Sequence, residues 1–315
     1  MKIKLITLLI VLSSIFSFGQ EQNYVESELK IPTNSVDING TLLNVSEVKK
    51  SPLVIIIPGS GPTDRNGNNA MMKNNSLKFL AENLSSKNIS TYRFDKSVLS
   101  YNSENIEKLD SLSFEIFINE AKTVLGFFKT SNNYSKIIVA GHSQGSLVGL
   151  LASQNKADGF ISLAGAGRSI DNILIEQISK QAPFLKEETE RIIDQLKEGV
   201  IVEDYNELLK SLFNKKTQPF LMSWIKYNPQ EQIKKLTIPI LIINGSNDIQ
   251  VATTEGELLH KSAQSSQLQI IENMNHLFKE IKGDINENML SYNNPNLPVM
   301  EELINIITTF VNEIK

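Results

Sequence analysis

Six short and almost uninterrupted apolar runs recur along this chain, and helix-like stretches separate most of them. Short continuous apolar runs are typical of strands that are buried on both faces of a sheet. Strands that alternate with helices form a mainly parallel sheet. The sequence therefore predicts an α/β fold, with a mainly parallel central sheet flanked by helices. The predicted strands are residues 53–57, 89–94, 137–140, 160–163, 238–243 and 268–271.

A hairpin is predicted ahead of these strands. Residues 25–43 alternate apolar and polar side chains, with turn signals at Ile31-Pro32 and at Asn39-Gly40. Alternation with a period of two indicates strands with one exposed face. We expect a small antiparallel hairpin at this end of the sheet.

Composition excludes several classes of protein. The chain has 315 residues, of which 41% are hydrophobic, so it can bury a large core and is not a disordered protein. Its 31 basic and 35 acidic residues give a net charge of −4. No cluster of Lys and Arg is interleaved with aromatic residues, as a nucleic-acid-binding surface requires. We expect no nucleic-acid partner.

The N-terminus has the features of a secretory signal peptide. Lys2 and Lys4 precede an apolar segment at 5–18, and the small residues Ser17 and Gly19 suit a signal peptidase. This segment is shorter than the roughly 20 residues that span a bilayer. We therefore expect a signal peptide over residues 1–19, a secreted or periplasmic protein, and no membrane span after cleavage. The chain has no cysteine, so neither disulfides nor a lipid-modified cysteine are expected.

A serine between two glycines follows the third of these strands. Gly141-His142-Ser143-Gln144-Gly145 comes directly after residues 137–140 and opens a helix-like stretch. This context is that of a nucleophile elbow, a strained strand-to-helix turn that exposes the serine hydroxyl above the sheet. The glycines are needed because a side chain at either position would collide with a neighbouring element. Ser143 is the candidate nucleophile.

A serine nucleophile needs a base, and the base needs an acid to orient it. Of the three histidines, we expect His142 to be turned away from Ser143 and His260 to be solvated on a helix. His276 follows the last predicted strand, and Asp248 follows the one before it, so both lie at the edge of the sheet where ligands bind in α/β folds. An Asp in such a turn and a His in a loop are usually only turn and surface residues. Nevertheless, the order serine, acid, histidine is that of the α/β-hydrolase triad.

Backbone amides are the expected donors to an oxyanion. One is the N–H of Gln144, which follows the nucleophile, and the other comes from the loop 58–62, where we favour Ser60 over Gly61. Gly61 and Arg65 are candidate substrate contacts, although a structural ion pair is the stronger reading of Arg65. The loop is not a dinucleotide-binding loop, because Asp64 stands where that motif needs a glycine. No metal-binding pattern is present, and no metal or cofactor is expected.

The alternation of strand and helix stops between residues 167 and 228. Four helix-period segments follow one another there, at 170–180, 186–198, 202–213 and 220–227. We interpret 167–228 as an inserted helical cap between two parts of the core, 20–166 and 229–315. Phe220 and Trp224 are candidate substrate contacts from this cap, although aromatic residues there can equally pack the cap against itself. The acidic residues Glu187, Glu188 and Glu190 fit a solvated helix face better than a binding site for an amino group.

Four segments resemble a known family. They are 57–67, 92–96, 141–145, and 244–251 together with Asn275-His276. The chain resembles secreted bacterial α/β-hydrolases of the serine esterase type, similar to dienelactone-hydrolase-like and prolyl-oligopeptidase-like proteins. The resemblance implies hydrolysis of small carboxylic esters through an acyl-enzyme, with Ser143, Asp248 and His276 as the triad and no cofactor. The chain departs from the family pattern at 97–100, which affects the expected substrate preference.

Two alternatives remain from the sequence. A serine peptidase would use the same triad on a different bond. A non-catalytic exported binding protein would use the same scaffold without turnover.

Overall fold

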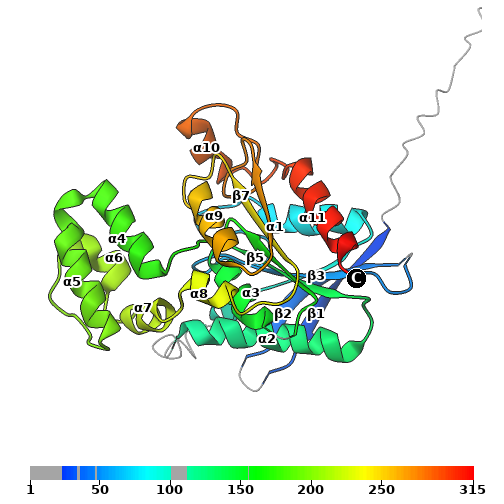
Figure 1. Ribbon diagram of the computed structural model, residues 1–315, viewed down its shortest axis with the longest axis horizontal. Helices are drawn as coiled ribbons and strands as arrows, with labels where there is room; N and C mark the ends of the chain where they lie inside the picture. Colours follow the sequence, from blue (N-terminus) through cyan, green and yellow to red (C-terminus); the bar gives the residue numbers. More distant parts are fainter. Residues whose placement is uncertain (1–22, 34–35, 47, 101–111, 155) are drawn as a thin grey trace, which may run out of the picture.

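The computed structural model describes residues 23–33, 36–46, 48–100, 112–154 and 156–315 (Figure 1). The predicted signal peptide, residues 1–19, lies outside the described residues. Within the described residues no helix is both long and apolar enough to cross a membrane.

A single mixed sheet organises the described chain, and it confirms the predicted α/β fold. Its strand order is β1-β2-β4-β3-β5-β6-β7-β8, in which β1, β2 and β4 pair antiparallel and every pair from β4 to β8 is parallel. The six predicted apolar runs all correspond to parallel strands. The strands are β1 Tyr24–Ile31, β2 Ile38–Val45, β3 Leu53–Ile57, β4 Ser90–Phe94, β5 Ile137–His142, β6 Gly159–Leu163, β7 Ile240–Gly245 and β8 Gln267–Ile271.

Strand β3 is continuously apolar because helices cover both faces of the sheet there. In β3, Leu53, Ile55 and Ile57 pack into the cluster formed with α2 and α3, whereas Val54 and Ile56 pack into the cluster formed with α1 and α11. All five side chains are at most 2% exposed, so no position on this strand can be polar without loss of core. The covering helices are α1 Ser76–Ser86, α2 Phe114–Ser131, α3 Gln144–Ser153, α8 Pro229–Ile233, α9 Thr253–Ser262 and α11 Glu301–Glu313, and α10 is Ile285–Ser291.

Helices α4 Ile170–Gln181, α5 Lys186–Lys197, α6 Lys210–Phe213 and α7 Gln218–Ile225 form a lobe beside the sheet. Figure 1 shows them on the left of the molecule, connected to the sheet on one side by the segment before α4 and on the other by α8. The lobe has its own buried cluster, which includes Ile192, Ile193 and Phe213. Its internal core explains why helix-period segments follow one another in this part of the sequence.

One predicted helix of the lobe is shorter and less regular than the sequence predicts. Of residues 202–213, only a 3₁₀ turn at Glu207–Leu209 and the four-residue α6 are helical. The buried Gln218 side chain hydrogen-bonds to both the N–H and the carbonyl of Val202. These tertiary bonds satisfy the backbone that a helix would otherwise satisfy.

The predicted N-terminal hairpin is present as β1 and β2, but Asn39-Gly40 is not a turn. Gly40 lies inside β2 and pairs with Leu29 and Phe94. A Cβ on Gly40 would lie 2.3 Å from the Tyr92 ring. The glycine therefore marks the close approach of an aromatic side chain to the strand and not a chain reversal.

Candidate active site

Ser143 occupies the sharp turn between β5 and α3. Its backbone has φ 53° and ψ −121°, a conformation that costs a non-glycine residue free energy. The strain is held in place from both sides, because the Ser143 N–H donates to the Leu163 carbonyl and the Ser143 carbonyl accepts from Ser146 N–H, both at 2.9 Å. The turn leaves the serine at the carboxyl end of the central strand.

The flanking glycines are required by close backbone contacts. A Cβ on Gly141 would lie 2.0 Å from the Gly145 carbonyl oxygen, and a Cβ on Gly145 would lie 2.5 Å from the Pro58 carbonyl oxygen. Neither obstacle is a side chain that can rotate away. Packing against the end of β3 and the start of α3 therefore requires glycine two residues before and two residues after Ser143.

Asp248 and His276 come from the loops after β7 and β8 and meet in a hydrogen bond. The His276 Nδ1–H donates to Asp248 Oδ2 at 2.7 Å, and both side chains are almost fully buried. The second oxygen of Asp248 accepts the backbone N–H groups of Gln250 and Val251 at 2.8 and 2.9 Å. A carboxylate held by three donors fixes the imidazole as the tautomer whose Nε2 is free to accept a proton.

His276 and Ser143 line the same cavity of about 180 Å³. Within the described residues, the Ser143 hydroxyl makes no hydrogen bond to the imidazole. Catalytic hydrogen bonds are often long in the ligand-free state and shorten when substrate binds. The structure therefore brings the acid to the base directly, and the base and the serine to one cavity.

His142 has a structural role that its position in the sequence did not suggest. Its ring packs against that of His276, with centroids 4.7 Å apart, and its Nε2–H donates to the His276 backbone carbonyl at 2.9 Å. Burial, together with the neighbouring His276, lowers the pKa of His142 to about 3. A neutral His142 therefore holds the His276 loop without adding charge beside it. The predicted solvation of His260 agrees with its exposed position on α9.

Asn275 also fixes the loop that carries His276. This residue is fully buried, and its Oδ1 accepts the N–H groups of Leu277 and Lys279, both at 3.0 Å. Its Nδ2 donates to Asn288 Oδ1 and Ser291 Oγ at the start and end of one turn of α10. The hydrogen bonds of the Asn275 side chain therefore hold the loop that carries the His276 imidazole.

The two backbone amides expected to form an oxyanion hole, those of Ser60 and Gln144, have no hydrogen-bond acceptor among the described residues. The Gly59 carbonyl accepts a hydrogen bond from Lys96 Nζ at 2.6 Å. Since the N–H and C=O of a trans peptide point in opposite directions, this bond turns the Ser60 N–H away from Lys96. Ser60 lines a cavity together with Ser143 and Gln144. Lys96, on the opposite side of the loop, therefore orients the Ser60 amide.

Lys96 itself is buried, at 3% exposure, between a carboxyl and an aromatic ring. Its Nζ lies 4.9 Å from the centre of the Phe117 ring, and Glu120 is its charged neighbour. Burial lowers the pKa of Lys96 to about 8, against the opposing effect of Glu120. Burial likewise raises the pKa of Glu120, one oxygen of which accepts the Ser97 N–H at 3.3 Å. The departure from the family pattern at Ser97–Ser100 forms a 3₁₀ turn directly after this lysine.

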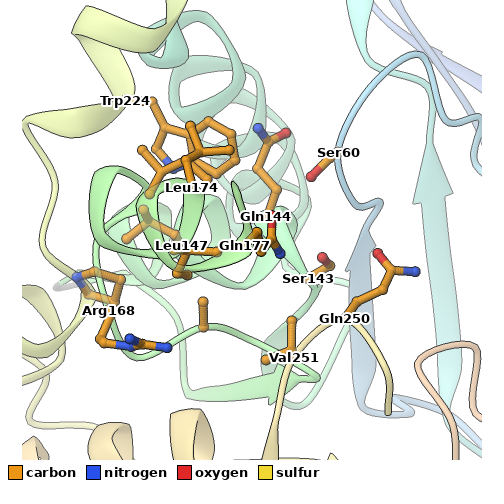
Figure 2. A pocket seen from close by; sticks show the side chains of 14 residues that line it. Ser60, Ser143, Gln144, Leu147, Arg168, Leu174, Gln177, Trp224, Gln250 and Val251 are labelled. Atoms are coloured by element: carbon orange, nitrogen blue, oxygen red, sulfur yellow. The ribbon is translucent and has the colours of Figure 1, made fainter. Parts of the chain in front are cut away.

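Two cavities adjoin Ser143. The first, which we call the apolar cavity, has a volume of about 280 Å³ and lies beneath the lobe (Figure 2). Figure 2 shows Trp224 and Leu174 on one side of it and Ser143, Ser60 and Gln250 on the other. The second, the polar cavity, is the one that contains His276. The apolar side chains that line the apolar cavity include Leu147, Ile173, Leu174, Trp224, Pro229 and Val251, and the polar ones include Gln144, Arg168, Gln177 and Gln250. The polar cavity is lined by Thr63, Asn69, Asn74, Ser76, His276 and Tyr292, among others.

Of the four candidate substrate contacts, only Trp224 lines one of these cavities. Phe220 instead packs edge-on against Phe114 and Phe117, as the packing alternative predicts. Gly61 lies exposed on the loop with φ 69°, outside the described walls of both cavities.

Arg65 is occupied by a structural ion-pair network. Its guanidinium donates to Asp95 at 2.7 and 3.0 Å and to Glu28 at 2.5 Å. It does not appear among the described residues that line either cavity. The geometry therefore favours the structural reading of Arg65 over substrate contact.

No group of three His, Cys, Asp or Glu side chains within the described ranges is arranged to hold a metal ion. The arrangement instead offers a strained serine, a histidine paired with a buried carboxylate, and two free backbone N–H groups. These are the parts that acyl transfer through a covalent serine intermediate requires.

Comparisons with known proteins agree on the fold. The chain is 27% identical over 269 residues to "Esterase EstD" from Thermotoga maritima, in an alignment that covers 81% of this chain and 62% of that protein. The structure is similar to Est1E from Butyrivibrio proteoclasticus, with a TM-score of 0.58 at 17% identity, covering 91% of this chain and 99% of the other. It is also similar to an acylaminoacyl peptidase from Pyrococcus horikoshii, with a TM-score of 0.59 at 13% identity, covering 94% of this chain and 42% of the other.

The family is shown by the sequence itself. The family model described as "Serine aminopeptidase, S33" matches residues 74–280, which is more than half of the chain and includes Ser143, Asp248 and His276. The chain therefore belongs to the serine aminopeptidase S33 family and has the α/β-hydrolase fold.

Proposed function

We propose that this protein is a serine hydrolase that cleaves small carboxylic esters through an acyl-enzyme. The observation that carries the proposal is the convergence of Ser143, at a strained turn, with the Asp248-paired His276 at one cavity. The relative named as an esterase supports the same class of reaction.

In the proposed reaction, Ser143 Oγ attacks the ester carbonyl carbon while His276 Nε2 accepts the hydroxyl proton. Asp248 stabilises the imidazolium that forms and keeps its orientation. His276 then returns the proton to the alcohol oxygen as the C–O bond breaks. Water, activated by the same imidazole, attacks the acyl-enzyme and releases the acid.

The negative charge that develops on the carbonyl oxygen is accepted by the N–H groups of Ser60 and Gln144. A preorganised donor of this kind contributes about 3 kcal/mol to the transition state. The bond from Lys96 to Gly59 supports Ser60 as one of the two donors. We propose Lys96 as a positioning residue that acts through this peptide and touches no substrate.

We favour an ester over an N-terminal peptide bond because the cavities lack an acidic side chain. An aminopeptidase must hold a positively charged terminus, yet no Asp or Glu lines the apolar or the polar cavity among the described residues. Of the cap glutamates, Glu188 accepts the Asn206 N–H and Glu190 pairs with Lys186. The lobe at 167–228 acts in this proposal as a cap that selects the acyl or alcohol group.

Export is part of the proposal. Residues 1–19 have the pattern of a signal peptide. N-terminal sequencing of the protein recovered from outside the cytoplasm should give a chain that begins at or near Gln20. Recovery of the uncleaved chain from the cytoplasm would refute export.

The catalytic proposal is tested with a simple ester, a serine-directed probe and amino-acid amides. The parent protein should hydrolyse p-nitrophenyl acetate and react with a fluorophosphonate probe at Ser143, whereas Ser143→Ala should do neither. Ser86→Ala, an exposed serine on α1, is the matched control and should behave as the parent. Faster release of p-nitroaniline from amino-acid p-nitroanilides than of p-nitrophenol from esters would establish a peptidase. Failure of the folded parent to react with the probe would leave only a binding function.

A further inference from the structure

Three glutamine side chains line the apolar cavity beside its apolar ones. Gln144 begins α3, Gln177 lies on α4 of the lobe, and Gln250 lies on the loop after β7 (Figure 2). Gln177 and Gln250 are exposed, and the Gln250 NH₂ group already donates to the Tyr292 hydroxyl at 3.0 Å. Gln144 differs from both, because the protein encloses it almost completely.

The Gln144 amide has no hydrogen-bond partner within the described residues. Gln144 is 7% exposed, and no described residue bonds to its side-chain oxygen or NH₂ group. Both amide atoms nevertheless retain accessible surface, whereas those of the buried Asn244 are sealed from any ligand. Since Gln144 lines the cavity, its unpaired amide is available to a molecule that enters it.

A substrate that fills the cavity determines whether this amide stays unpaired. In the free protein, solvent in the cavity can hydrogen-bond to it. A ligand group that displaces ordered water without reproducing its hydrogen bonds loses affinity. A donor or acceptor that is then buried without a partner costs the full free energy of its desolvation. An alkyl chain against Gln144 would therefore bind less well than a group that pairs with both amide atoms.

One edge of a carboxamide or of a lactam pairs with both atoms at once. A glutamine amide presents an acceptor oxygen and a donor N–H side by side, and it recognises a complementary edge through two parallel hydrogen bonds. A ketone or ether oxygen would pair with the NH₂ group alone. A trans peptide bond directs its N–H and its C=O to opposite sides. The chemistry therefore favours a primary carboxamide or a lactam.

The matching group is uncharged. Arg168 is the single charged side chain among the described residues that line this cavity. It pairs with Glu176 at 2.5 Å and donates through Nε to the buried Glu255 at 2.6 Å. Because its charge is balanced, a substrate carboxylate would be buried there without a free counter-charge. No Asp or Glu of the described chain lines the cavity, so an ammonium group would also lack one.

Gln144 directly follows the nucleophile, which places the matching group near the ester. Its backbone N–H is one of the two proposed donors to the oxyanion, and Ser60, which carries the other, lines the same cavity. One residue thus offers its backbone to the carbonyl oxygen and its side chain to a second group of the same substrate.

We propose that the Gln144 side chain is a specificity determinant, which pairs through two hydrogen bonds with a primary carboxamide or a lactam that the substrate carries near its ester group. This inference rests on the proposed function, because it concerns the substrate of the same serine. It assigns the Gln144 side chain a role in binding and leaves the chemical steps unchanged.

Four ethyl esters of similar size test the pairing. Ethyl succinamate ends in a carboxamide, ethyl 4-oxopentanoate replaces the NH₂ group by methyl, ethyl pentanoate lacks both polar atoms, and monoethyl succinate carries a carboxylate. The kcat/KM of each ester would be divided by its rate constant for alkaline hydrolysis, which removes differences in intrinsic reactivity. Normalised kcat/KM should favour succinamate over pentanoate by about tenfold or more, and over 4-oxopentanoate by about fivefold, because two and one hydrogen bonds are gained. Monoethyl succinate should be the poorest substrate.

The lactam is tested in the same way. Ethyl pyroglutamate would be compared with ethyl 3-oxocyclopentanecarboxylate, in which a methylene replaces the ring N–H. A preference confined to the open-chain or to the cyclic esters identifies the source of the amide edge.

Variants locate the selectivity. Gln144→Met removes the amide and keeps the backbone N–H at this position, and the normalised ratio of succinamate to pentanoate should fall by about tenfold. Gln154→Met is the matched control. Gln154 is the C-cap residue of the same helix and lies outside both cavities, so its replacement should keep the parental ratio.

The outcomes separate this inference from the proposed function. If the parent protein shows equal normalised kcat/KM for the amide esters and for their ketone and hydrocarbon counterparts, the inference is overturned, even where Gln144→Met fails to fold. Retention of the parental ratio in a folded Gln144→Met variant would also overturn it. Turnover of p-nitrophenyl acetate would still support the serine hydrolase in both cases. Absence of that turnover in the parent protein would instead refute the proposed function itself.

Discussion

Replacing Lys96 by Met tests whether a buried lysine orients the oxyanion hole. Met preserves most of the side-chain volume and removes the 2.6 Å bond to the Gly59 carbonyl. A hydrogen bond from a charged donor contributes about 1.5–3 kcal/mol. If that free energy is lost only in the transition state, kcat should fall by about 10- to 100-fold with little change in KM. Complete loss of one oxyanion donor sets the upper limit, at about 100- to 1,000-fold.

The pH profile separates a positioning effect from a general loss of packing. Because the pKa of Lys96 is lowered to about 8, the charged donor is lost as the pH rises through about 8, and kcat should decline there in the parent protein. Lys96→Met should show a lower kcat without this alkaline decline. Rates would be measured with p-nitrophenyl acetate between pH 6 and 10, with circular dichroism as the control for folding.

Lys279→Met is the matched control for the removal of a buried lysine. Lys279 is also fully buried, has a pKa lowered to about 8 by burial, and donates to a backbone carbonyl, that of Leu297. Its ammonium lies over the Phe79 ring at 4.7 Å and not beside Gly59. It should lose comparable stability with a much smaller effect on kcat. If folded Lys96→Met keeps the parental kcat and the parental alkaline decline, the argument from the Gly59–Ser60 peptide is wrong.

Other predictions concern the site and the sheet. Asp248→Asn should lower kcat by about 10³- to 10⁴-fold with KM nearly unchanged, because an amide favours the wrong imidazole tautomer; a loss below tenfold would contradict the role of the acid. His142→Phe should lower kcat by about fivefold through the lost bond to the His276 carbonyl, as steady-state kinetics would show. Gly40→Ala should lower the free energy of unfolding by at least about 2 kcal/mol, since its Cβ would meet the Tyr92 ring. Gly126→Ala, on α2 with open space around the new Cβ, should raise it by up to about 1 kcal/mol in urea denaturation, and a decrease would be unexpected.

The architecture could be predicted from the sequence because burial on both faces leaves a direct mark on it. Every parallel strand from β3 to β8 coincides with an apolar run to within two residues at either end, and β3 to β7 are buried along their whole length. Local patterns failed where a single distant side chain decided the conformation. The Gln218 side chain hydrogen-bonds to the backbone of Val202, which was predicted to be helical. The Tyr92 ring requires a glycine inside β2, at a position where the sequence indicated a turn.

For the site, the sequence identified residues that follow strands but not those that support them. Ser143, Asp248 and His276 were named because each follows an apolar run at the same edge of the sheet. The bonds from His142 to the His276 carbonyl and from Lys96 to the Gly59 carbonyl join segments distant in the chain to backbone atoms, and no side-chain pattern reports a backbone acceptor. For Lys96, its place at the end of the segment 92–96, directly after a buried strand, was the available signal.

The lobe leaves the sheet after β6 and the chain returns as β7, and these two strands are hydrogen-bonded neighbours, with Phe160 opposite Ile240. Because the inserted segment begins and ends on adjacent strands, its length can vary at little cost. Each doubling of a flexible loop adds only about 0.6 kcal/mol of closure entropy. Helical segments of different size can therefore be inserted between β6 and β7 without moving either strand. Such an exchange would redefine the wall contributed by Leu174 and Trp224 while the serine, the imidazole and its carboxylate stayed anchored to the sheet.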